Sequence, residues 1–370
     1  MVRSRARVRA LRMGFRVLFG LPRPVKRRLA GAPVRVDGQV LDLDLQLLNR
    51  AGQVLVSAND GPIGEATLAE QRRQADLAAD LANDSGLDDI HTRDLDLPGP
   101  DRPIAARLYV PPAAPEPSGL LVYYHGGGFV LGSLASTDPL CRLIAAQSGL
   151  RVLSVDYRLA PEHPYPAGLE DAIAAFRCAR SQAASLGADP ELLAVGGDSA
   201  GGNLALVVAH QEGATEGPAF VLALYPVTDA ERGGGSRELF GTGFGLTAEF
   251  LAQLERLYLP NGVPSDDVRG AILRAEDLSG MPPVYLATAG FDPLRDEGEE
   301  LVDRLRASGV PVVARRFAGL VHGYASFTAA SAAARDATLD AASAVRTGLV
   351  LARTANQVGR RSTERGTRLF

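Results

Sequence analysis

Short apolar runs alternate with longer segments of helical periodicity through most of the chain after residue 100. Most of these runs are apolar throughout, which is typical of strands buried on both faces of a parallel sheet. The pattern predicts strands over 105–110, 120–124, 151–155, 192–195, 220–224, 284–287 and 311–317. It predicts helices over 139–147, 168–186, 204–211, 294–308 and 325–351. Such alternation indicates an α/β fold, with a mostly parallel central sheet and helices on both faces.

Three segments depart from this alternation. Residues 63–90 have the periodicity of a helix that precedes the first predicted strand. Residues 229–280 interrupt the pattern with glycine-rich stretches, a helix over 247–258 and a proline-bearing loop. An insertion at this place is well positioned to form a lid. The last segment lacks apolar periodicity, so we expect residues 353–370 to form a disordered tail.

The N-terminal segment is basic and has the pattern of an amphipathic helix over residues 3–19. Pro22 and Pro24 are expected to end this helix. A basic amphipathic helix can lie on an anionic membrane surface. Alternatively, it packs over the functional site with its arginines in solvent. The apolar stretch is too short for a signal peptide, and no small-residue cleavage site follows. The apolar face consists of Val8, Leu11, Phe15, Leu18 and Phe19.

Composition and charge exclude several classes of protein. The chain of 370 residues suits an α/β domain with a smaller appendage. Residues 1–30 contain basic residues but no Asp or Glu, whereas the whole chain has a net charge of −4. The rest of the chain is therefore acidic, which argues against a nucleic-acid-binding core. Cys141 and Cys178 lack metal-ligand spacing, so we expect buried thiols, a reducing cytoplasmic compartment and no metal. No apolar run reaches 18 residues, which argues against a membrane span.

Candidate chemistry starts with a Gly-x-Ser-x-Gly sequence at Gly197, Ser199 and Gly201. Apolar runs over 192–195 and 204–209 flank it, so the serine is expected in a tight turn between a buried strand and a helix. Small neighbours are needed because the two backbones approach closely, and glycine tolerates backbone angles that other residues resist. This is the context of a nucleophile elbow, although five residues alone would also suit a glycine-rich phosphate loop.

A serine hydroxyl is a weak nucleophile and needs an adjacent base that an acid orients. In this type of fold the three residues follow in the order serine, acid, histidine. Of the five histidines, His322 alone follows the last predicted strand, and we expect it near Ser199. Asp292 directly follows the penultimate strand and is the preferred acid. Asp296 and Glu297 compete with it, but they lie in the next helical turn, where they can serve the helix N-terminus instead.

A glycine run after the strand over 120–124 supplies candidate donors for an oxyanion. His125, Gly126, Gly127 and Gly128 are consecutive, and the glycine amides are not blocked by side chains. Attack by a serine creates an oxyanion that needs preorganised N–H donors. We expect the amides of Gly127, Gly128 and Ala200 to form this hole. His125 is then a structural residue of the loop and not a base.

Together these motifs resemble the hormone-sensitive-lipase-like family of α/β hydrolases, the bacterial family IV esterases. The resemblance extends from about residue 105 to residue 327 and includes the segment 156–167, which is similar to the family's segment after the third core strand. The Gly-Asp-Ser-Ala-Gly sequence is similar to the branch with an aspartate, here Asp198, before the serine. Gly126, Asp198, Glu162 and His163 are expected to support the site.

The resemblance implies Ser199 as nucleophile, His322 as base and Asp292 as orienting acid. It also implies a cap built from residues 1–90 and an insertion at about 230–275, over an α/β-hydrolase catalytic domain of residues 91–352.

The function implied by the resemblance is that of a serine carboxylesterase, which cleaves short- to medium-chain carboxylic esters through an acyl-enzyme. No cofactor is implied, and the expected partner is a small-molecule ester. The same triad would also support hydrolysis of lactones, carbamates or amides, or deacetylation. A ligand-binding receptor on the same fold is a further alternative, which the presence of His322 disfavours. The expected assembly is a monomer or a homodimer in the cytoplasm, with peripheral membrane contact through residues 3–19 if that helix binds lipid.

Overall fold

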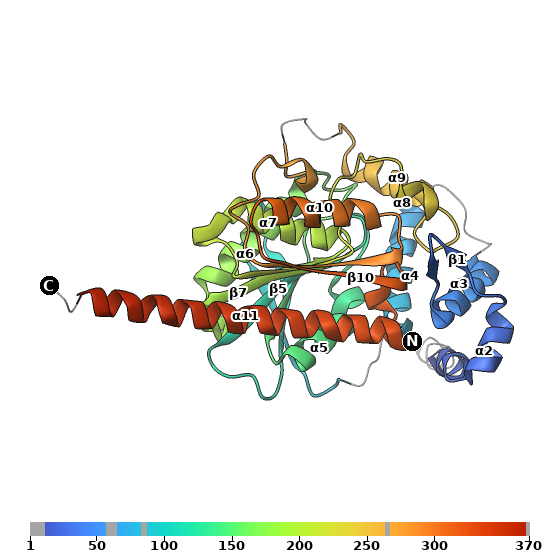
Figure 1. Ribbon diagram of the computed structural model, residues 1–370, viewed down its shortest axis with the longest axis horizontal. Coiled ribbons are helices and arrows are strands. Elements are labelled where there is room, and N and C mark those ends of the chain that lie inside the picture. Colours follow the sequence, from blue (N-terminus) through green and yellow to red (C-terminus); the bar gives the residue numbers. More distant parts are fainter. Residues whose placement is uncertain (1–11, 57–64, 83–86, 263–266, 368–370) are drawn as a thin grey trace.

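Figure 1 shows the computed structural model of the chain, which describes residues 12–56, 65–82, 87–262 and 267–367. An eight-stranded sheet runs through the centre in the order β10-β9-β8-β7-β5-β6-β4-β3. Its strands from β10 to β6 are parallel, whereas β4 pairs antiparallel with β6 and β3 antiparallel with β4. The α/β class and the mostly parallel sheet are therefore confirmed. The strands are β3 (His91–Leu97), β4 (Ile104–Val110), β5 (Ser118–Tyr124), β6 (Arg151–Val155), β7 (Ala188–Asp198), β8 (Phe220–Leu224), β9 (Val284–Phe291) and β10 (Val312–Val321).

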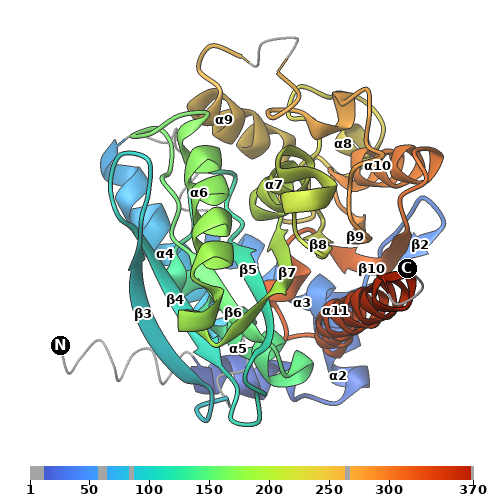
Figure 2. The same ribbon diagram turned by 90° about the vertical axis from the view of Figure 1, so that its left-hand side faces the viewer.

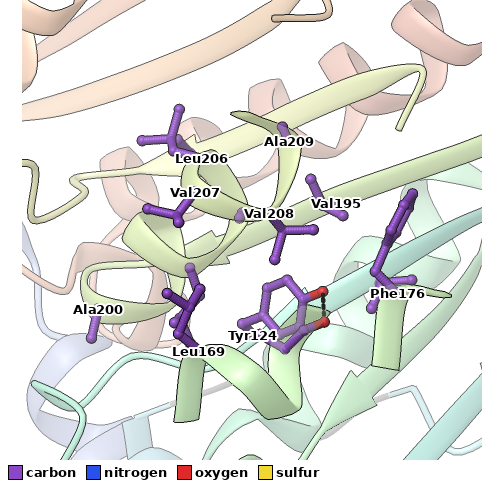
Figure 3. Close-up of a cluster of buried hydrophobic side chains, with 14 of the residues drawn as sticks. Tyr124, Leu169, Phe176, Val195, Ala200, Leu206, Val207, Val208 and Ala209 are labelled. Atoms are coloured by element: carbon purple, nitrogen blue, oxygen red, sulfur yellow. Dashed lines mark hydrogen bonds between the residues drawn. The ribbon is translucent and has the colours of Figure 1, made fainter. Parts of the chain in front are cut away.

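Helices cover both faces of the sheet, as Figure 2 shows with α7 and α10 above it and α5 and α11 below. Because successive side chains of a strand point to opposite faces, β5 contributes to both layers. Tyr124 packs among residues of α6 and α7 (Figure 3), whereas Tyr123 belongs to the buried cluster that includes α5 and α11. The helices of these layers are α5 (Leu134–Ser148), α6 (Ala167–Ser181), α7 (Ala200–Glu216), α10 (Arg295–Ala307) and α11 (Ala332–Thr367).

The parallel strands all end at the same edge of the sheet. β5, β7, β9 and β10 lead directly into His125, Ser199, Asp292 and His322. Residues far apart in sequence therefore meet there, which is the usual place for a site in a sheet of this kind. Most residues of β5, β7 and β9 are buried, and β10 is buried at its carboxyl end, at Leu320 and Val321, so the core fixes the ends of these strands.

A second group of helices gathers at this end of the molecule, on the right of Figure 1. Residues 12–19 are helical, and Phe19 is buried against Leu43 and Leu47. The helix predicted from residue 3 begins outside the described residues. It ends before Pro22, whereas Pro24 lies in the first turn of the next helix. The elements are α2 (Arg23–Ala30), α3 (Leu43–Val56), α4 (Glu65–Ala82), α8 (Ser236–Leu239), α9 (Ala248–Tyr258) and the small sheet of β1 (Arg35–Val36) and β2 (Gln39–Val40).

The C-terminal prediction was wrong for most of its length, because α11 continues to Thr367 instead of giving way to disorder at residue 353. The helix is nucleated on the body, where Ala341, Val345 and Leu349 are buried. The following residues contain no proline and include four arginines, so extension adds a hydrogen bond per residue without a new nucleation step. In Figure 1 the end of α11 projects beyond the body.

Two further expectations concern the environment of the chain. Cys141 and Cys178 are free and buried, in agreement with the prediction of buried thiols. In the described part of the chain, no helix has both the length and the apolar character that crossing a membrane would require.

Candidate active site

Ser199 lies in the turn between β7 and α7 with a φ of +54°. A non-glycine residue rarely adopts such an angle, so the surrounding structure must hold it. A Cβ on Gly197 would overlap the backbone of Gly201, and a Cβ on Gly201 would overlap the carbonyl of Tyr124. The Ser199 amide donates to the carbonyl of Leu224 on β8 at 2.8 Å. The two glycines therefore permit a tight strand-to-helix turn that presents the serine at the edge of the sheet.

The imidazole of His322 bridges Ser199 and Asp292. Its Nε2 lies 2.9 Å from Ser199 Oγ, and its Nδ1 lies 2.8 Å from Asp292 Oδ2. Asp292 is fully buried, and its other oxygen accepts the amide of Leu294 at 2.8 Å. Because the carboxylate accepts from Nδ1, the neutral ring carries its proton there and directs the Nε2 lone pair at the hydroxyl. The structure thus brings the three predicted residues together in the order that serine activation requires.

The two competing acids on α10 have other partners. Asp296 accepts the amide of Ser236 at 2.8 Å. Glu297 is buried and pairs with the Arg237 guanidinium at 3.0 Å, and burial raises the pKa of Glu297 to about 7. Both carboxylates fasten the inserted segment to α10. The acid that contacts His322 is the one that directly follows β9.

The glycine loop after β5 lines the same cavity as the serine. Gly127 and Gly128 have φ values of +121° and +62°. A Cβ on Gly127 would overlap the carbonyl of Leu131, and one on Gly128 would overlap the side chain of Leu254. Within the described residues the amides of both glycines make no hydrogen bond, and Ala200 begins α7, where the first amides of a helix lack intrahelical partners. These are the donors that an oxyanion hole requires.

Two side chains, Asp198 and His125, hold this loop in place. Asp198 Oδ1 accepts the amide of Gly126 at 3.0 Å and the hydroxyl of Tyr123 at 2.8 Å, and burial raises the pKa of Asp198. His125 stacks on Tyr157 with ring centroids 4.3 Å apart, and its Nδ1 donates to the Gly126 carbonyl at 2.8 Å. Burial lowers the pKa of His125, which disfavours the charged ring. The residue before the serine is therefore tied directly to the first glycine of the loop.

Glu162 and His163 lie farther from the serine. Glu162 is exposed and pairs with Arg72 of α4 at 2.8 Å, and this hydrogen bond lowers the pKa of Glu162. His163 is half-buried, and its backbone amide donates to the carbonyl of Leu159 at 2.9 Å. In the part of the chain that the structure describes, neither side chain lines the cavity above the serine. Any support that they give the site is therefore indirect.

The cavity above the serine has a volume of about 320 Å³. Its floor is formed by the serine, His322 and the glycine loop, and most of its wall is apolar. Phe129 of the loop stacks on Tyr258 of α9 with centroids 3.8 Å apart, which closes one side. Among the described residues, no group of three or more His, Cys, Asp or Glu side chains could hold a metal ion. The wall includes Ala75, Ala78 and Ala79 of α4, Phe250, Leu251, Leu254 and Tyr258 of α9, and Phe327.

The sequence analysis expected a cap from the segments that carry α4 and α9, but it did not identify the side chains of this wall, nor Tyr123 and Arg72, which bind Asp198 and the glycine loop. A usable signal was present in α9, where Leu251, Leu254 and Tyr258 recur at helical spacing on one face. Tyr123 and Arg72 had no comparable signal. A tyrosine in a buried strand and an arginine on a helix are ordinary, and their roles depend on contacts with residues far away in sequence.

Comparisons with known proteins agree with this geometry. Residues 121–326 match the family model described as the alpha/beta hydrolase fold. The chain is 42% identical over 321 residues to the carboxylic ester hydrolase LipN of Mycobacterium tuberculosis, which covers 84% of each chain. It is 36% identical to the ethyl acetate hydrolase of Pseudomonas putida, over 74% of this chain and 86% of that protein.

Solved structures show the same similarity. An ester-hydrolase from the metagenome of Lake Arreo superposes with a TM-score of 0.77 at 36% identity, over 83% of this chain and 98% of that chain. The hyperthermophilic esterase of the archaeon Pyrobaculum calidifontis superposes with a TM-score of 0.74 at 34% identity, over 81% and 97%. The matched family region contains the serine turn, the glycine loop and both partners of the serine. The chain therefore belongs to the hormone-sensitive-lipase-like, bacterial family IV esterases of the α/β-hydrolase superfamily.

Proposed function

We propose that the chain is a serine carboxylesterase in which Ser199 is the nucleophile, His322 the general base and Asp292 the orienting acid. The observation that carries this proposal is the 2.9 Å contact between His322 Nε2 and Ser199 Oγ, made by a ring whose other nitrogen is held at 2.8 Å by a buried carboxylate. The names of the relatives, which are ester hydrolases, favour esters over other acyl compounds.

The mechanism follows from these positions. Ser199 Oγ attacks the ester carbonyl carbon while His322 Nε2 takes the hydroxyl proton, and Asp292 stabilises the imidazolium that forms. The carbonyl oxygen becomes an oxyanion, which the amides of Gly127, Gly128 and Ala200 would hold. Collapse of this intermediate breaks the bond to the alcohol, which leaves with the proton from Nε2. Water, activated by the same nitrogen, then attacks the acyl-enzyme and releases the acid.

The proposed substrates are esters of short to medium acyl chains. A volume of about 320 Å³ lies at the small end of the range for ligand pockets, about 300–1,000 Å³. The apolar wall favours a hydrocarbon chain because its burial removes apolar surface from water. We also propose that residues 1–90 and about 230–275 form the cap, since α4 and α9 supply much of this wall.

A p-nitrophenyl ester series from acetate to palmitate tests the function, with wild type and the Ser199→Ala variant compared. We expect wild type to hydrolyse the shorter chains and the variant to be inactive while its fold is retained. Full activity in the variant would refute the assignment of Ser199. Amide and lactone substrates with matched acyl groups test the alternative acyl transfers, and preference for one of them over the ester would refute the ester as the reacting class.

Peripheral membrane contact is proposed on the outer face of the N-terminal helices. The side with Phe19 is buried, as the packed alternative expects, but Met13, Val17, Val25 and Leu29 are 68%, 61%, 42% and 47% exposed. Three arginines of the same two helical segments are exposed, and each basic group near an anionic surface contributes about 1 kcal/mol to binding. Because these exposed residues lie between 12 and 30, we propose that the membrane contact is made by residues 12–30 and not by residues 3–19 alone. The arginines are Arg16, Arg23 and Arg28.

Vesicle sedimentation tests this contact. The quadruple serine variant at Met13, Val17, Val25 and Leu29 is compared with wild type on anionic and on neutral vesicles, at low and high salt. We expect wild type to bind anionic vesicles at low salt and the variant to bind less. Equal binding of the two proteins to anionic vesicles would refute membrane contact through these four side chains.

The proposed compartment is the cytoplasm, which the two free thiols support, and the proposed assembly is a monomer or a homodimer. Light scattering on the eluted protein distinguishes these two states, and a larger mass would contradict both.

A further inference from the structure

Helix α4 contacts the glycine loop at two points that follow Gly127 and Gly128 in the chain. The Arg72 guanidinium donates from Nε to the carbonyl of Val130 at 2.9 Å. One turn later, Asp76 Oδ1 accepts the hydroxyl of Ser133 at 2.7 Å. Residues four apart lie on the same face of a helix, so both contacts come from the face of α4 that meets the loop.

Arg72 spans two adjoining loops with one planar group. Its Nη2 donates to the carbonyl of Ala160 at 2.9 Å, and Nη1 and Nη2 bind the Glu162 carboxylate at 2.8 and 2.9 Å. The amide of Ala160 in turn donates to the carbonyl of Phe129 at 2.9 Å. The rigid fork of an arginine suits this task, because its donors are fixed in one plane. Arg72 therefore joins the glycine loop to the segment that carries Glu162.

The backbone that these contacts hold is strained. Gly127, Gly128 and Phe129 all have positive φ values, and the last of them is not a glycine. The amides of Val130 and Leu131 both donate to the carbonyl of Gly127, at 3.2 and 2.8 Å, so a displacement at residue 130 is transmitted to residue 127. A strained conformation persists only where its surroundings over-determine it.

Ser133 connects the second contact to a fixed element. Its hydroxyl caps α5 by accepting the amides of Ala135 and Ser136, both at 3.1 Å, while it donates to Asp76. The loop is thus held at its start by Asp198, within the catalytic domain, and near its end by α4. Removal of α4 would leave the end of the loop without two of its hydrogen-bonding partners.

We propose that Arg72 and Asp76 are positioning residues that make the oxyanion hole depend on the closed position of α4. This inference rests on the proposed function, because it assumes that the loop amides stabilise an oxyanion. When α4 packs on the loop, the amides of Gly127 and Gly128 are set for catalysis. When α4 moves away, the carbonyl of Val130 and the hydroxyl of Ser133 lose their partners and the hole loses its geometry.

The test compares Arg72→Gln and Asp76→Ala with Arg73→Gln. Arg73 is exposed on the same helix and pairs with Glu70, so it serves as a matched control. We expect kcat to fall in Arg72→Gln by about 10-fold to 100-fold, since loss of one oxyanion donor costs about 10²–10³-fold and displacement of the reacting geometry by about 1 Å costs about 10²-fold. Asp76→Ala should show the same signature, with KM close to that of wild type in both.

Inhibition by a trifluoromethyl ketone provides a readout that a purely structural role would not change. Its adduct with serine places an oxyanion in the hole, so its inhibition constant should rise in proportion to the fall in kcat/KM. Glu162→Gln removes the ion pair but retains both carbonyl contacts of Arg72, and it should lose less activity than Arg72→Gln. If Arg72→Gln fails to fold, Asp76→Ala carries the same test.

Two results would overturn the inference. One is a kcat of Arg72→Gln and Asp76→Ala equal to that of Arg73→Gln. The other is a loss of activity without weaker binding of the ketone. Either result, with Ser199→Ala inactive and wild type active on esters, would refute the positioning role alone. Inactivity of wild type on every ester would instead refute the proposed function.

Discussion

The contact between Tyr123 and Asp198 offers a specific test of how the site is held together. The Tyr123 hydroxyl donates to the half-buried Asp198 carboxylate at 2.8 Å, and the same oxygen accepts the Gly126 amide. Tyr123→Phe removes this donor without changing the shape of the ring. Hydrogen bonds to charged groups contribute about 1.5–3 kcal/mol, so we expect the free energy of unfolding at pH 8 to fall by about 2 kcal/mol.

The neighbouring residue provides a matched control. Tyr124 is equally buried, but its hydroxyl donates to the neutral carbonyl of Ala172 at 2.9 Å (Figure 3). A neutral hydrogen bond contributes about 0.5–1.5 kcal/mol, so Tyr124→Phe should cost about 1 kcal/mol. Only Tyr123→Phe should also lower kcat, because Asp198 anchors Gly126 at the start of the glycine loop.

Urea unfolding at pH 8 gives the two free energies, and p-nitrophenyl butyrate gives kcat. The reasoning is refuted if Tyr123→Phe is no less stable than Tyr124→Phe. It is also refuted if the two variants have the same kcat, since the carboxylate would then not connect the serine turn with the loop.

Three other predictions follow from the same geometry. Burial raises the pKa of Glu297 from an ordinary value near 4.5 to about 7, so its ionisation between these values should destabilise the folded protein by up to about 3 kcal/mol as pH rises. Glu297→Gln removes this titration. The free energy of unfolding of wild type minus that of the variant, measured with urea, should therefore fall between pH 4.5 and pH 8. A difference that does not change with pH would contradict the raised pKa. Gly128→Ala adds a Cβ that overlaps Leu254 at a φ of +62°, and kcat on p-nitrophenyl butyrate should fall by about 10²-fold or more, whereas near-normal turnover would exclude a role for this amide. Asp292→Asn should lower kcat by about 10⁴-fold in the same assay, and a loss below tenfold would point to another acid.

Much of the fold could be predicted because the buried strands leave a clear pattern. The strands at 151–155 and 220–224 have the predicted bounds, since all their residues are buried and apolar residues predominate in both. β3 was missed because it lies at the edge of the sheet, and only Leu97 of its seven residues is buried. The end of α11 was missed because it has no apolar periodicity, although the helix continues through it from a buried and proline-free segment.

The residues of the candidate site likewise fall into those that the sequence could place and those that it could not. Residues that directly follow a strand, such as Ser199 and His322, could be placed from sequence because parallel strands end at one edge. Arg72 and Tyr123 could not, because their contacts join segments separated by 58 and 75 positions. Periodicity reports which side of an element is buried, but it does not report which distant group the buried side meets.

The central claim is that Ser199 is the nucleophile, and covalent labelling tests it most directly. A p-nitrophenyl alkylphosphonate should react with wild type so that an Oγ–phosphorus bond forms and p-nitrophenolate leaves. We predict one equivalent of p-nitrophenolate per chain, and an adduct that peptide mass mapping assigns to Ser199. Ser199→Ala should release none. Labelling of the Ser199→Ala variant, or an adduct on another residue in an enzyme that hydrolyses esters, would contradict the account.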